Sequence, residues 1–503
     1  MIKKVFLPLV VMLILFTSCA VSNKNYDPSR KYSRQQLQQD YSLLRNILET
    51  KHPALYWYTP KDSMNFYFDS LYNNIADSMT ELQFGWSVIA PLTQKIHCGH
   101  TSFAMSKHWN KYIRDRVIPS FPLYVKVWGK GDTMVVTGNL NSKDSIIKRG
   151  MLITSINGLN NHQLVQRMFL NLPLDGYANN VNYIRLSSSF PYYHRNAFGL
   201  YKNYRVGYVD SLGNEKTTLL PMFSPVIDTV KKVNPPQGNG FPHRQTRKER
   251  RQNYRVMEID SSNNTATITL NTFSKGEGKH LRGFIKRSFK KIQQQHIQNL
   301  ILDLRSNGGG DVNMSLLLTK YLRNTPFKIA DSSYAVATSL KPYTKYISSG
   351  FFSNIGLFFV TKKQSDGNYH FGYWERHLFH PKKKNHFDGQ VYVLTSGLTF
   401  SASTIFCNAV KGQKNITLAG EETGGGWYGN SGLLIPDITL PITKLRVRLP
   451  FFKIVQYNHI ATKGTGVAPD ILIPPSVDGV RKGADRKMEI VKGLIKNSTS
   501  AGL

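Results

Sequence analysis

The chain has few cysteines, few acidic residues and no long apolar run after its first residues. Only 3 of its 503 residues are cysteines, which excludes a scaffold held together by several disulfides, and no Cys/His spacing typical of zinc accompanies them. Acidic residues number 31 against 65 Lys and Arg, giving a formal net charge of +34. The apolar run at residues 5–16 is too short to span a bilayer.

The remaining composition is that of a folded protein with two or three domains. Apolar residues make up 41% of the chain and aromatic residues 12%, which argues against wholesale disorder. The basic residues gather in expected loops at 242–255, 286–291 and 381–384, and no nucleic-acid-binding pattern accompanies them. We therefore expect no nucleic-acid partner. Solvated basic loops, or attraction to anionic lipid or cell-wall polymers, both explain this charge.

Ser401 lies where a predicted buried strand meets a predicted helix. Val391, Val393 and Leu394 indicate the strand, and apolar residues at helical spacing follow at 405–410. Such a turn exposes the serine hydroxyl, and the free N–H groups of the helix start can stabilise an oxyanion. The same position is also typical of a helix-capping serine, so the residues alone leave both roles open.

A second strand, glycine loop and helix lie upstream, at residues 299–322. The strand ends at Leu304, and Gly308, Gly309 and Gly310 form the loop. Consecutive glycines let backbone amides approach a ligand closely. A phosphate-binding loop is a rival interpretation, but the sequence lacks the Lys that its pattern requires. A plain surface turn is the other alternative.

Three motifs occur in one order: D-L-R-S-N-G-G-G (303–310), T-F-S-A-S-T-I-F (399–406) and G-T-G-V-A-P-D-I (464–471). Together they resemble the tail-specific (C-terminal processing) serine protease family. The resemblance implies an α/β, ClpP/crotonase-like core with a mostly parallel sheet, and a peptidase that needs neither cofactor nor metal. It also implies that Ser401 is the nucleophile, and that Ala402 and either Gly309 or Gly310 supply the oxyanion-hole amides.

The base that activates the serine must come from elsewhere in the chain. One branch of the family uses a Lys shortly after the serine, but Gly426 occupies the matching position here. The T-G-G-G string at 423–426 resembles the tricorn-like branch instead, in which an upstream histidine is the base. The G-H-T string at 99–101 matches that branch's histidine motif. We therefore predict His100 as the base, with His97 as its rival.

A carboxylate usually orients such a histidine. In the tricorn-like pattern a Glu precedes the G-V-x-P-D motif, whereas this chain has Lys463 there. Glu421 and Glu422, beside the second glycine string, are the substitutes that composition and sequence proximity offer. We predict Glu422 as the third member of the triad, with Glu421 or no carboxylate as the alternatives.

The N-terminus has the pattern of an export signal. Lys3 and Lys4 precede the apolar run, which leads into F-T-S-C at 16–19. This string resembles a bacterial lipoprotein signal. It implies lipidation of Cys19 and a protein anchored to a membrane of the bacterial cell envelope, on the periplasmic side.

Patterning along the chain divides it into seven segments. Apolar residues three and four apart predict helices in the N-terminal region, and short alternating runs predict strands in the second. Residues 150–158 of that second region resemble the signature of peptide-binding PDZ domains. The segments are a signal peptide (1–18), a tether (19–31), a helical region (32–118), a PDZ-like, mostly-β domain (119–221), a basic linker or insertion (222–253), the protease core (254–475) and a C-terminal tail (476–503).

The predicted function is that of an envelope-located serine endopeptidase that acts on protein or peptide substrates through an acyl-enzyme on Ser401. The residues at 426 and 463 leave open a catalytically inactive relative that binds peptides as a scaffold. The charge alone suggests a binder of anionic polymers. Cys98 and Cys407 lie close in sequence to the candidate catalytic residues, and either a disulfide or two buried thiols is compatible with that.

Overall fold

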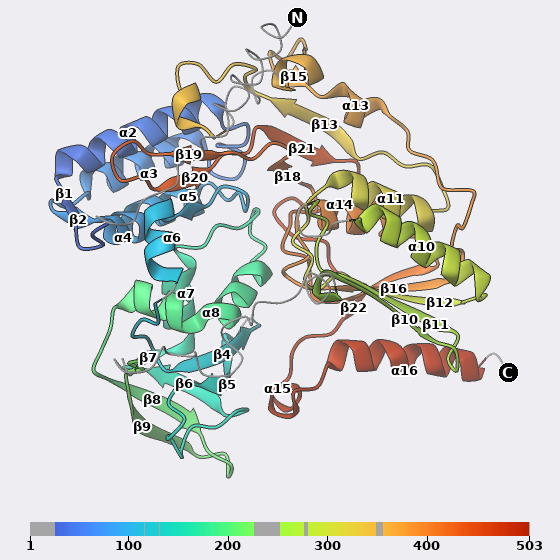
Figure 1. Cartoon of the computed structure of the whole chain (residues 1–503), viewed down its shortest axis with the longest axis horizontal. Helices are drawn as coiled ribbons and strands as arrows, with labels where there is room; N and C mark the ends of the chain where they lie inside the picture. The colour runs from blue at the N-terminus through green and yellow to red at the C-terminus, as the bar shows by residue number, and fades with distance from the viewer. Residues whose placement is uncertain are drawn as a thin grey trace, which may run out of the picture.

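The computed structural model describes residues 26–114, 116–129, 131–225, 252–275, 280–348 and 356–501 (Figure 1). The predicted signal peptide, Cys19 and most of the predicted linker at 222–253 lie outside the described residues. The described part is a mixed α/β structure, as predicted. Its helical N-terminal region and its second domain lie on one side of Figure 1, and the sheet of the core lies on the other.

The N-terminal region is helical, as its apolar spacing predicts. Ser33 and Gln36 form a reciprocal capping box that starts the first long helix. That helix buries Leu37, Tyr41 and Leu44 on one face. Its elements are β1 (Lys31–Tyr32), α2 (Arg34–Lys51), α3 (Lys61–Asn73), β2 (Met79–Thr80), α4 (Glu81–Phe84), the π-helical turn η1 (Gly85–Ile89), α5 (Ala90–Lys95), β3 (Phe103–Ala104) and α6 (Lys107–Arg114).

The second domain contains an antiparallel sheet in the order β4-β5-β6-β8-β9, with β7 beside β6. Its hairpin turns at 212–214, as predicted, between β8 and β9. Residues 180–198 form a helix that the strand-like reading of this region missed. Pro191 lies inside that helix and Ser189 kinks it, so the local sequence conceals the helical spacing. The elements are β4 (Leu123–Trp128), β5 (Thr133–Asn139), β6 (Leu152–Ile156), β7 (Leu159–Asn160), α7 (Asn161–Phe169), α8 (Asn180–Phe198), β8 (Asn203–Val209) and β9 (Glu215–Pro221).

The core is built on a six-stranded sheet in the order β10-β11-β12-β16-β17-β22. Only the β10–β11 pair is antiparallel, so the mostly parallel sheet is confirmed. Leu300 and Leu302 point to the side of α10, α11 and α14, whereas Ile301 points to the side of α16. The bounds are β10 (Arg255–Asp260), β11 (Thr265–Leu270), α10 (Leu281–Gln294), β12 (Asn299–Asp303), α11 (Val312–Leu322), β16 (Gln390–Thr395), α14 (Ala402–Val410), β17 (Ile416–Gly420) and β22 (Ile471–Leu472).

A second, antiparallel sheet connects the core to the N-terminal helices. Its strands follow the order β14-β15-β13-β21-β18. In a separate three-stranded sheet, β20 pairs with β19 on one side and with β3 of the helical region on the other. One hydrophobic cluster joins residues of this sheet to residues of α2, α3 and α5. The bounds are β13 (Ala330–Ala335), the short 3₁₀ helix η2 (Thr344–Tyr346), β14 (Lys362–Lys363), β15 (Tyr369–His370), α13 (Gly372–Arg376), β18 (Gly429–Gly432), β19 (Asp437–Thr439), β20 (Arg446–Arg448) and β21 (Phe452–Gln456).

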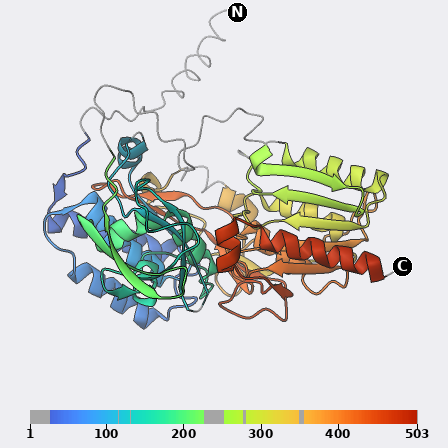
Figure 2. The ribbon, with the colours of Figure 1, turned by 90° about the horizontal axis from the view of Figure 1, so that it is seen from below.

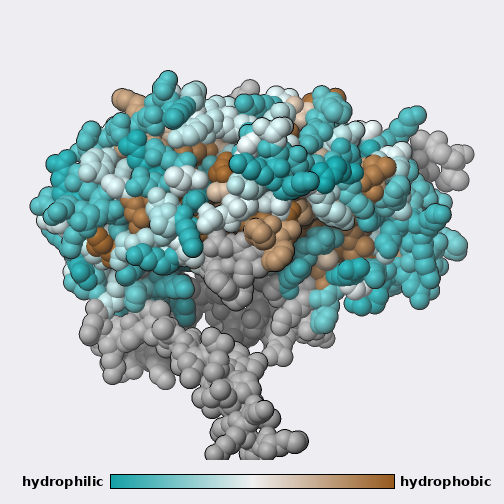
Figure 3. All heavy atoms as spheres, turned by 90° about the horizontal axis from the view of Figure 1, so that it is seen from above, coloured by the Kyte–Doolittle hydropathy of each residue, from teal (hydrophilic) through white to brown (hydrophobic). Residues whose placement is uncertain are grey.

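The C-terminal tail is part of the core. It forms α15 (Val477–Lys482) and α16 (Arg486–Ala501). Val491 and Ile495 pack on the face of the sheet opposite α10 and α11 (Figures 1 and 2). The face in Figure 3 is largely hydrophilic, with scattered hydrophobic residues. Among the described residues, no helix has both the length and the apolar character needed to cross a membrane, and no group of three potential metal ligands occurs.

Candidate active site

Ser401 occupies a strained turn between β16 and α14. Its backbone has φ 56° and ψ −121°, a left-handed conformation that a residue with a side chain rarely adopts. Its side chain makes no capping hydrogen bond to α14. The structure therefore separates the two roles left open by the sequence: Ser401 precedes the helix without capping it, and the turn leaves its hydroxyl available for chemistry.

The first glycine loop, residues 307–310, lies directly against this turn. A Cβ atom on Gly309 would lie 2.7 Å from the Cβ of Ser401 and 2.9 Å from the backbone nitrogen of Ala402. Asn307 holds the loop in place, because its carbonyl accepts from Phe400 N–H (3.1 Å). The close approach requires glycine at 309, as the predicted role of the loop demands.

The hydrogen bonds of this loop distinguish its two candidate oxyanion donors. The N–H of Gly309 donates to Asn307 Oδ1 (2.9 Å). The N–H groups of Gly310 and Ala402 donate to no group among the described residues. Because an oxyanion hole needs unoccupied donors, Gly310 and Ala402 are better placed for this role than Gly309.

His100 reaches the serine turn from the N-terminal region. Its ring lies against the ring of Phe400, with a centroid distance of 5.0 Å, next to Ser401 in the chain. The side chain is buried, and its Nδ1 has no hydrogen-bond partner. Burial, with smaller contributions from Arg448 and Arg185, lowers the pKa of His100 to about 3. The imidazole is therefore neutral at pH 7, and it forms no hydrogen bond with Ser401 in this structure.

His97, the rival base, is occupied otherwise. Its Nδ1 donates to the carbonyl oxygen of Gly176 (2.6 Å), and its ring lies 5.0 Å from that of Tyr177. The backbone of His97 also accepts a hydrogen bond from Gly176 N–H (3.0 Å). These contacts tie His97 to the second domain, whereas His100 faces the residue before the candidate nucleophile.

The predicted third member, Glu422, is not brought to His100. Its Oε1 accepts from the N–H of Gly466 (2.5 Å), and Glu421 forms an ion pair with Lys487 of α16. Burial raises the pKa of Glu422, against the opposing effect of this hydrogen bond. The prediction rested on sequence proximity, but the chain after β17 turns so that both carboxylates find other partners.

The second glycine loop, residues 423–426, packs behind Ser401. A Cβ atom on Gly425 would lie 3.0 Å from the backbone nitrogen of Ser401, and one on Gly426 would clash with the carbonyl oxygen of Gly429. A lysine at 426 has no space here, which agrees with the prediction that the Ser-Lys arrangement is absent. Lys463, which occupies the position of the Glu in the tricorn-like pattern, places its ammonium over the ring of Tyr58, 5.7 Å from the ring centroid.

The sequence analysis missed a buried carboxylate, that of Asp175. It lies on a loop of the second domain, residues 173–179, which we call the Asp175 loop. Its Oδ1 accepts from Gly99 N–H (2.7 Å), beside His100, and its Oδ2 accepts from Gly426 N–H (3.2 Å). One side chain thus joins the histidine turn to the second glycine loop. The only signal in the sequence was the Asp-Gly pair at 175–176, which reads as an ordinary turn.

Burial dominates the electrostatics of this carboxylate. Asp175 is 2% exposed, and burial raises its pKa to about 6, while its two backbone hydrogen bonds and the charge of Arg185 oppose that rise. The same loop makes a further contact, because Tyr177 N–H donates to the carbonyl of Gly464 (2.7 Å). The Asp175 loop therefore contacts three of the segments that surround the candidate site.

The two described cysteines do not pair. Cys98 and Cys407 are both free and buried, so of the two alternatives the structure has the buried thiols. Burial raises the pKa of Cys98 to about 11 and that of Cys407 to about 12, which favours the protonated, unreactive thiol near neutral pH.

Comparison with solved structures finds a similar fold in mature CPAF and weaker similarity in two further chains. Mature CPAF complexed with lactacystin matches with a TM-score of 0.62 and 13% identity, covering 92% of this chain and 99% of that one. A putative peptidase from Parabacteroides merdae matches with a TM-score of 0.45 and 14% identity, over 92% and 97% of the two chains. The tricorn protease matches with a TM-score of 0.41 and 14% identity, over 92% of this chain and 37% of that one.

Comparison by sequence gives a family for the core. A search of curated proteins found no match to this chain. Residues 264–473, however, match peptidase family S41, and they contain both the glycine loops and Ser401. The chain therefore carries a domain of peptidase family S41 and is a serine-type peptidase.

Proposed function

We propose that the protein is an endopeptidase in which Ser401 is the nucleophile and His100 the general base. Ser401 Oγ attacks the carbonyl carbon of the peptide bond, and its proton passes to the imidazole of His100. The C–N bond then breaks, the amine leaves with that proton, and water hydrolyses the acyl-enzyme. The N–H groups of Ala402 and Gly310 stabilise the oxyanion.

The observation that carries the proposal is the turn at Ser401. A serine held at φ 56° without a capping bond represents strain that a purely structural serine would not need. The first glycine loop touches it on one side, and His100 lies beside the preceding residue. A neutral base and two unoccupied amides around a hydroxyl that makes no capping bond are the components of acyl transfer.

Asp175 is a positioning residue in this proposal. No hydrogen bond joins it to the imidazole of His100, but it accepts one from the N–H of the preceding residue, Gly99. It also holds Gly426, in the loop that packs behind Ser401. The carboxylate thereby sets the distance between the base and the nucleophile without taking part in proton transfer.

A fluorophosphonate probe tests the nucleophile directly. We expect the wild-type protein to form a covalent adduct at Ser401 and the Ser401→Ala variant to form none. The neighbouring Ser403→Ala variant, which removes a buried hydroxyl without a partner, is the matched control and should still be labelled. Equal labelling of wild type and Ser401→Ala contradicts the peptidase mechanism and favours the inactive peptide-binding scaffold.

The choice of base has its own test. His100→Ala should lower the labelling rate by at least about a hundredfold, in the range typical of a general base. His97→Ala should keep most of the rate, because His97 contacts the Asp175 loop and not the serine turn. The reverse order of the two variants would move the base to His97.

We also propose that the protein is anchored in the bacterial cell envelope through a lipid on Cys19, with its peptidase on the periplasmic side. Support comes from the charged start, the apolar run and the F-T-S-C string at 16–19. Expressed in a bacterium, the wild type should partition with membranes, and Cys19→Ala should lose its lipid by mass spectrometry. A wild-type protein without a lipid on Cys19 by mass spectrometry would contradict the anchor.

A further inference from the structure

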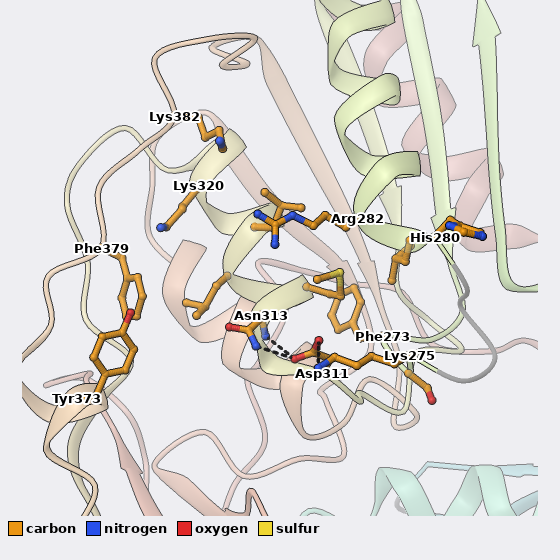
Figure 4. A pocket seen from close by; sticks show the side chains of 15 residues that line it. Phe273, Lys275, His280, Arg282, Asp311, Asn313, Lys320, Tyr373, Phe379 and Lys382 are labelled. Carbon is orange, nitrogen blue, oxygen red and sulfur yellow. Dashed lines mark hydrogen bonds and ion pairs between the residues drawn. The ribbon is translucent and has the colours of Figure 1, made fainter. Parts of the chain in front are cut away.

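A cavity of about 620 Å³ lies next to the first glycine loop, where Phe273 and Asp311 line it (Figure 4). Its walls come from the segment after β11, the start of α10, the first turns of α11, and α13 with the segment that follows it. We call it the cationic pocket. Ser401 and His100 do not line it, so it is distinct from the candidate catalytic centre.

The charge of the pocket is strongly one-sided. Four cationic side chains line it against a single carboxylate, that of Asp311; these cations are Lys275, Arg282, Lys320 and Lys382. Lys275 lies 3.3 Å from Asp311. The other three cations form no ion pair with any residue that the structure describes, so the pocket keeps an excess of positive charge.

Two of these lysines are held close together. The N–H of Lys382 donates to the carbonyl of Lys320 (2.7 Å), and their side chains lie near each other in Figure 4. Burial, with a further contribution from the charge of Lys382, lowers the pKa of Lys320. Like charges placed side by side repel each other, and an anion bound between them would relieve that repulsion.

The pocket also has an apolar floor and a backbone connection to the candidate site. Leu281, Met314 and Leu317 line it together with Phe273. Phe273 N–H donates to the carbonyl of Gly309 (2.8 Å), the residue that touches Ser401. One wall of the pocket is therefore hydrogen-bonded to the loop that faces the nucleophile.

We propose that the cationic pocket is a substrate subsite for an acidic stretch of the peptide. Carboxylates of the substrate bind Lys320, Lys382 and Arg282, while apolar side chains between them pack on the floor. A peptide whose scissile carbonyl lies at Ser401 and whose chain continues past the first glycine loop enters this pocket. The subsite rests on the proposed peptidase function and adds to it a preference for acidic substrates.

Binding to the full chain carrying Ser401→Ala tests the subsite without any chemistry. The probe is a fluorescein-labelled peptide of alternating Leu and Glu, compared by anisotropy with the same peptide in which Gln replaces Glu. We expect the Glu peptide to bind at least about tenfold more tightly, because several exposed charge pairs together reach that size. Raising the salt concentration should reduce the difference.

Charge variants locate the binding. Lys320→Gln with Lys382→Gln should remove most of the preference for Glu. Lys320→Glu with Lys382→Glu should reverse it, toward a peptide of alternating Leu and Lys. The matched control, Lys61→Gln with Lys107→Gln, removes the same charge from exposed sites on α3 and α6 and should keep the preference.

Three outcomes overturn the proposal. They are equal affinity for the Glu and Gln peptides, an equal loss in the control variant, and displacement of the peptide by inorganic polyphosphate that binds more tightly than the peptide does. Failure of the subsite can be distinguished from failure of the proposed peptidase function, because labelling and peptide binding are measured separately. Loss of fluorophosphonate labelling with an intact Glu preference refutes the mechanism alone, and the converse refutes the subsite alone.

Discussion

The contact between Gly309 and Ser401 makes the substitution Gly309→Ala a sharp test of the site. Gly309 has φ +92°, and a new Cβ atom would lie 2.7 Å from both the Cβ of Ser401 and the carbonyl oxygen of Phe400. The left-handed backbone costs an L-residue about 1–2 kcal/mol. Overpacking against a rigid turn adds about 1–3 kcal/mol.

The net effect of Gly309→Ala on the free energy of unfolding follows from these terms. Reduced entropy of the unfolded chain offsets about 0.4–1 kcal/mol of this, which leaves a net loss of about 1–5 kcal/mol. The new methyl group would also lie 2.9 Å from the nitrogen of Ala402 and displace a proposed oxyanion donor. Since one such donor contributes about a hundredfold or more to the rate, fluorophosphonate labelling should fall by about that factor.

Gly308 supplies the matched control in the same loop. A Cβ atom on Gly308 would meet no atom within 4 Å, so Gly308→Ala should leave labelling and the urea midpoint close to wild type. The two variants carry the same Gly→Ala substitution at neighbouring positions, so they have identical amino-acid compositions. If Gly309→Ala labels and unfolds like Gly308→Ala, the first glycine loop does not lie against Ser401 and the proposed oxyanion hole is wrong.

Three further predictions concern buried groups. Because the ionised Asp175 accepts two N–H groups, labelling should rise as the pH passes about 6, and Asp175→Asn should remove that step. The effect on stability has the opposite sign. Because the pKa of Asp175 is raised in the folded protein, its stabilising contribution of about 3 kcal/mol is present below pH 3.8 and is lost as the pH rises through about 6. The urea midpoint of the wild type should therefore fall relative to that of Asp175→Asn over this pH range. The buried carboxylate of Asp40 accepts hydrogen bonds from Ile442 N–H, Thr443 N–H and Thr443 Oγ1. Asp40→Ala should therefore lower the free energy of unfolding in urea by about 3 kcal/mol, and the exposed control Asp62→Ala should lower it by less than about 1 kcal/mol. Equal losses would contradict a stabilising role for the hydrogen bonds of Asp40. The thiols of Cys98 and Cys407 should resist alkylation at pH 8 in the native protein and react after unfolding, as mapped by mass spectrometry, and rapid native alkylation of either would contradict its burial.

Much of the core could be predicted because its signals are local. The strand at 299–303 is buried at almost every position, as a central parallel strand must be, and glycines mark the loops that follow it. The T-G-G-G string at 423–426 and the G-H-T string at 99–101 led to His100, and the structure places its ring against Phe400. That placement depended on the family resemblance, because nothing near His100 in the sequence indicates a base.

The parts that escaped prediction depend on contacts between distant segments. The second sheet includes strands such as β13 and β18, whose residues are small and polar (ADSSYA and GNSG), so no apolar alternation indicates them. Asp175 is buried by loops from two other parts of the chain, and its own neighbours indicate only a turn. Glu422 was chosen for its nearness in sequence, but the direction of the chain after β17 takes its carboxylate to Gly466.

The Asp175 loop has a consequence for when the protein can act. The histidine turn, this loop and the serine turn are synthesised in that order, and the second glycine loop, which receives Asp175, comes last. The hydrogen bonds from Gly99 and Gly426 cannot both form until the core has folded and docked on the second domain. An incomplete chain therefore lacks the contacts that would position the proposed base, so the peptidase would be inactive during synthesis. Activity would then require that the core and the second domain have both folded and docked.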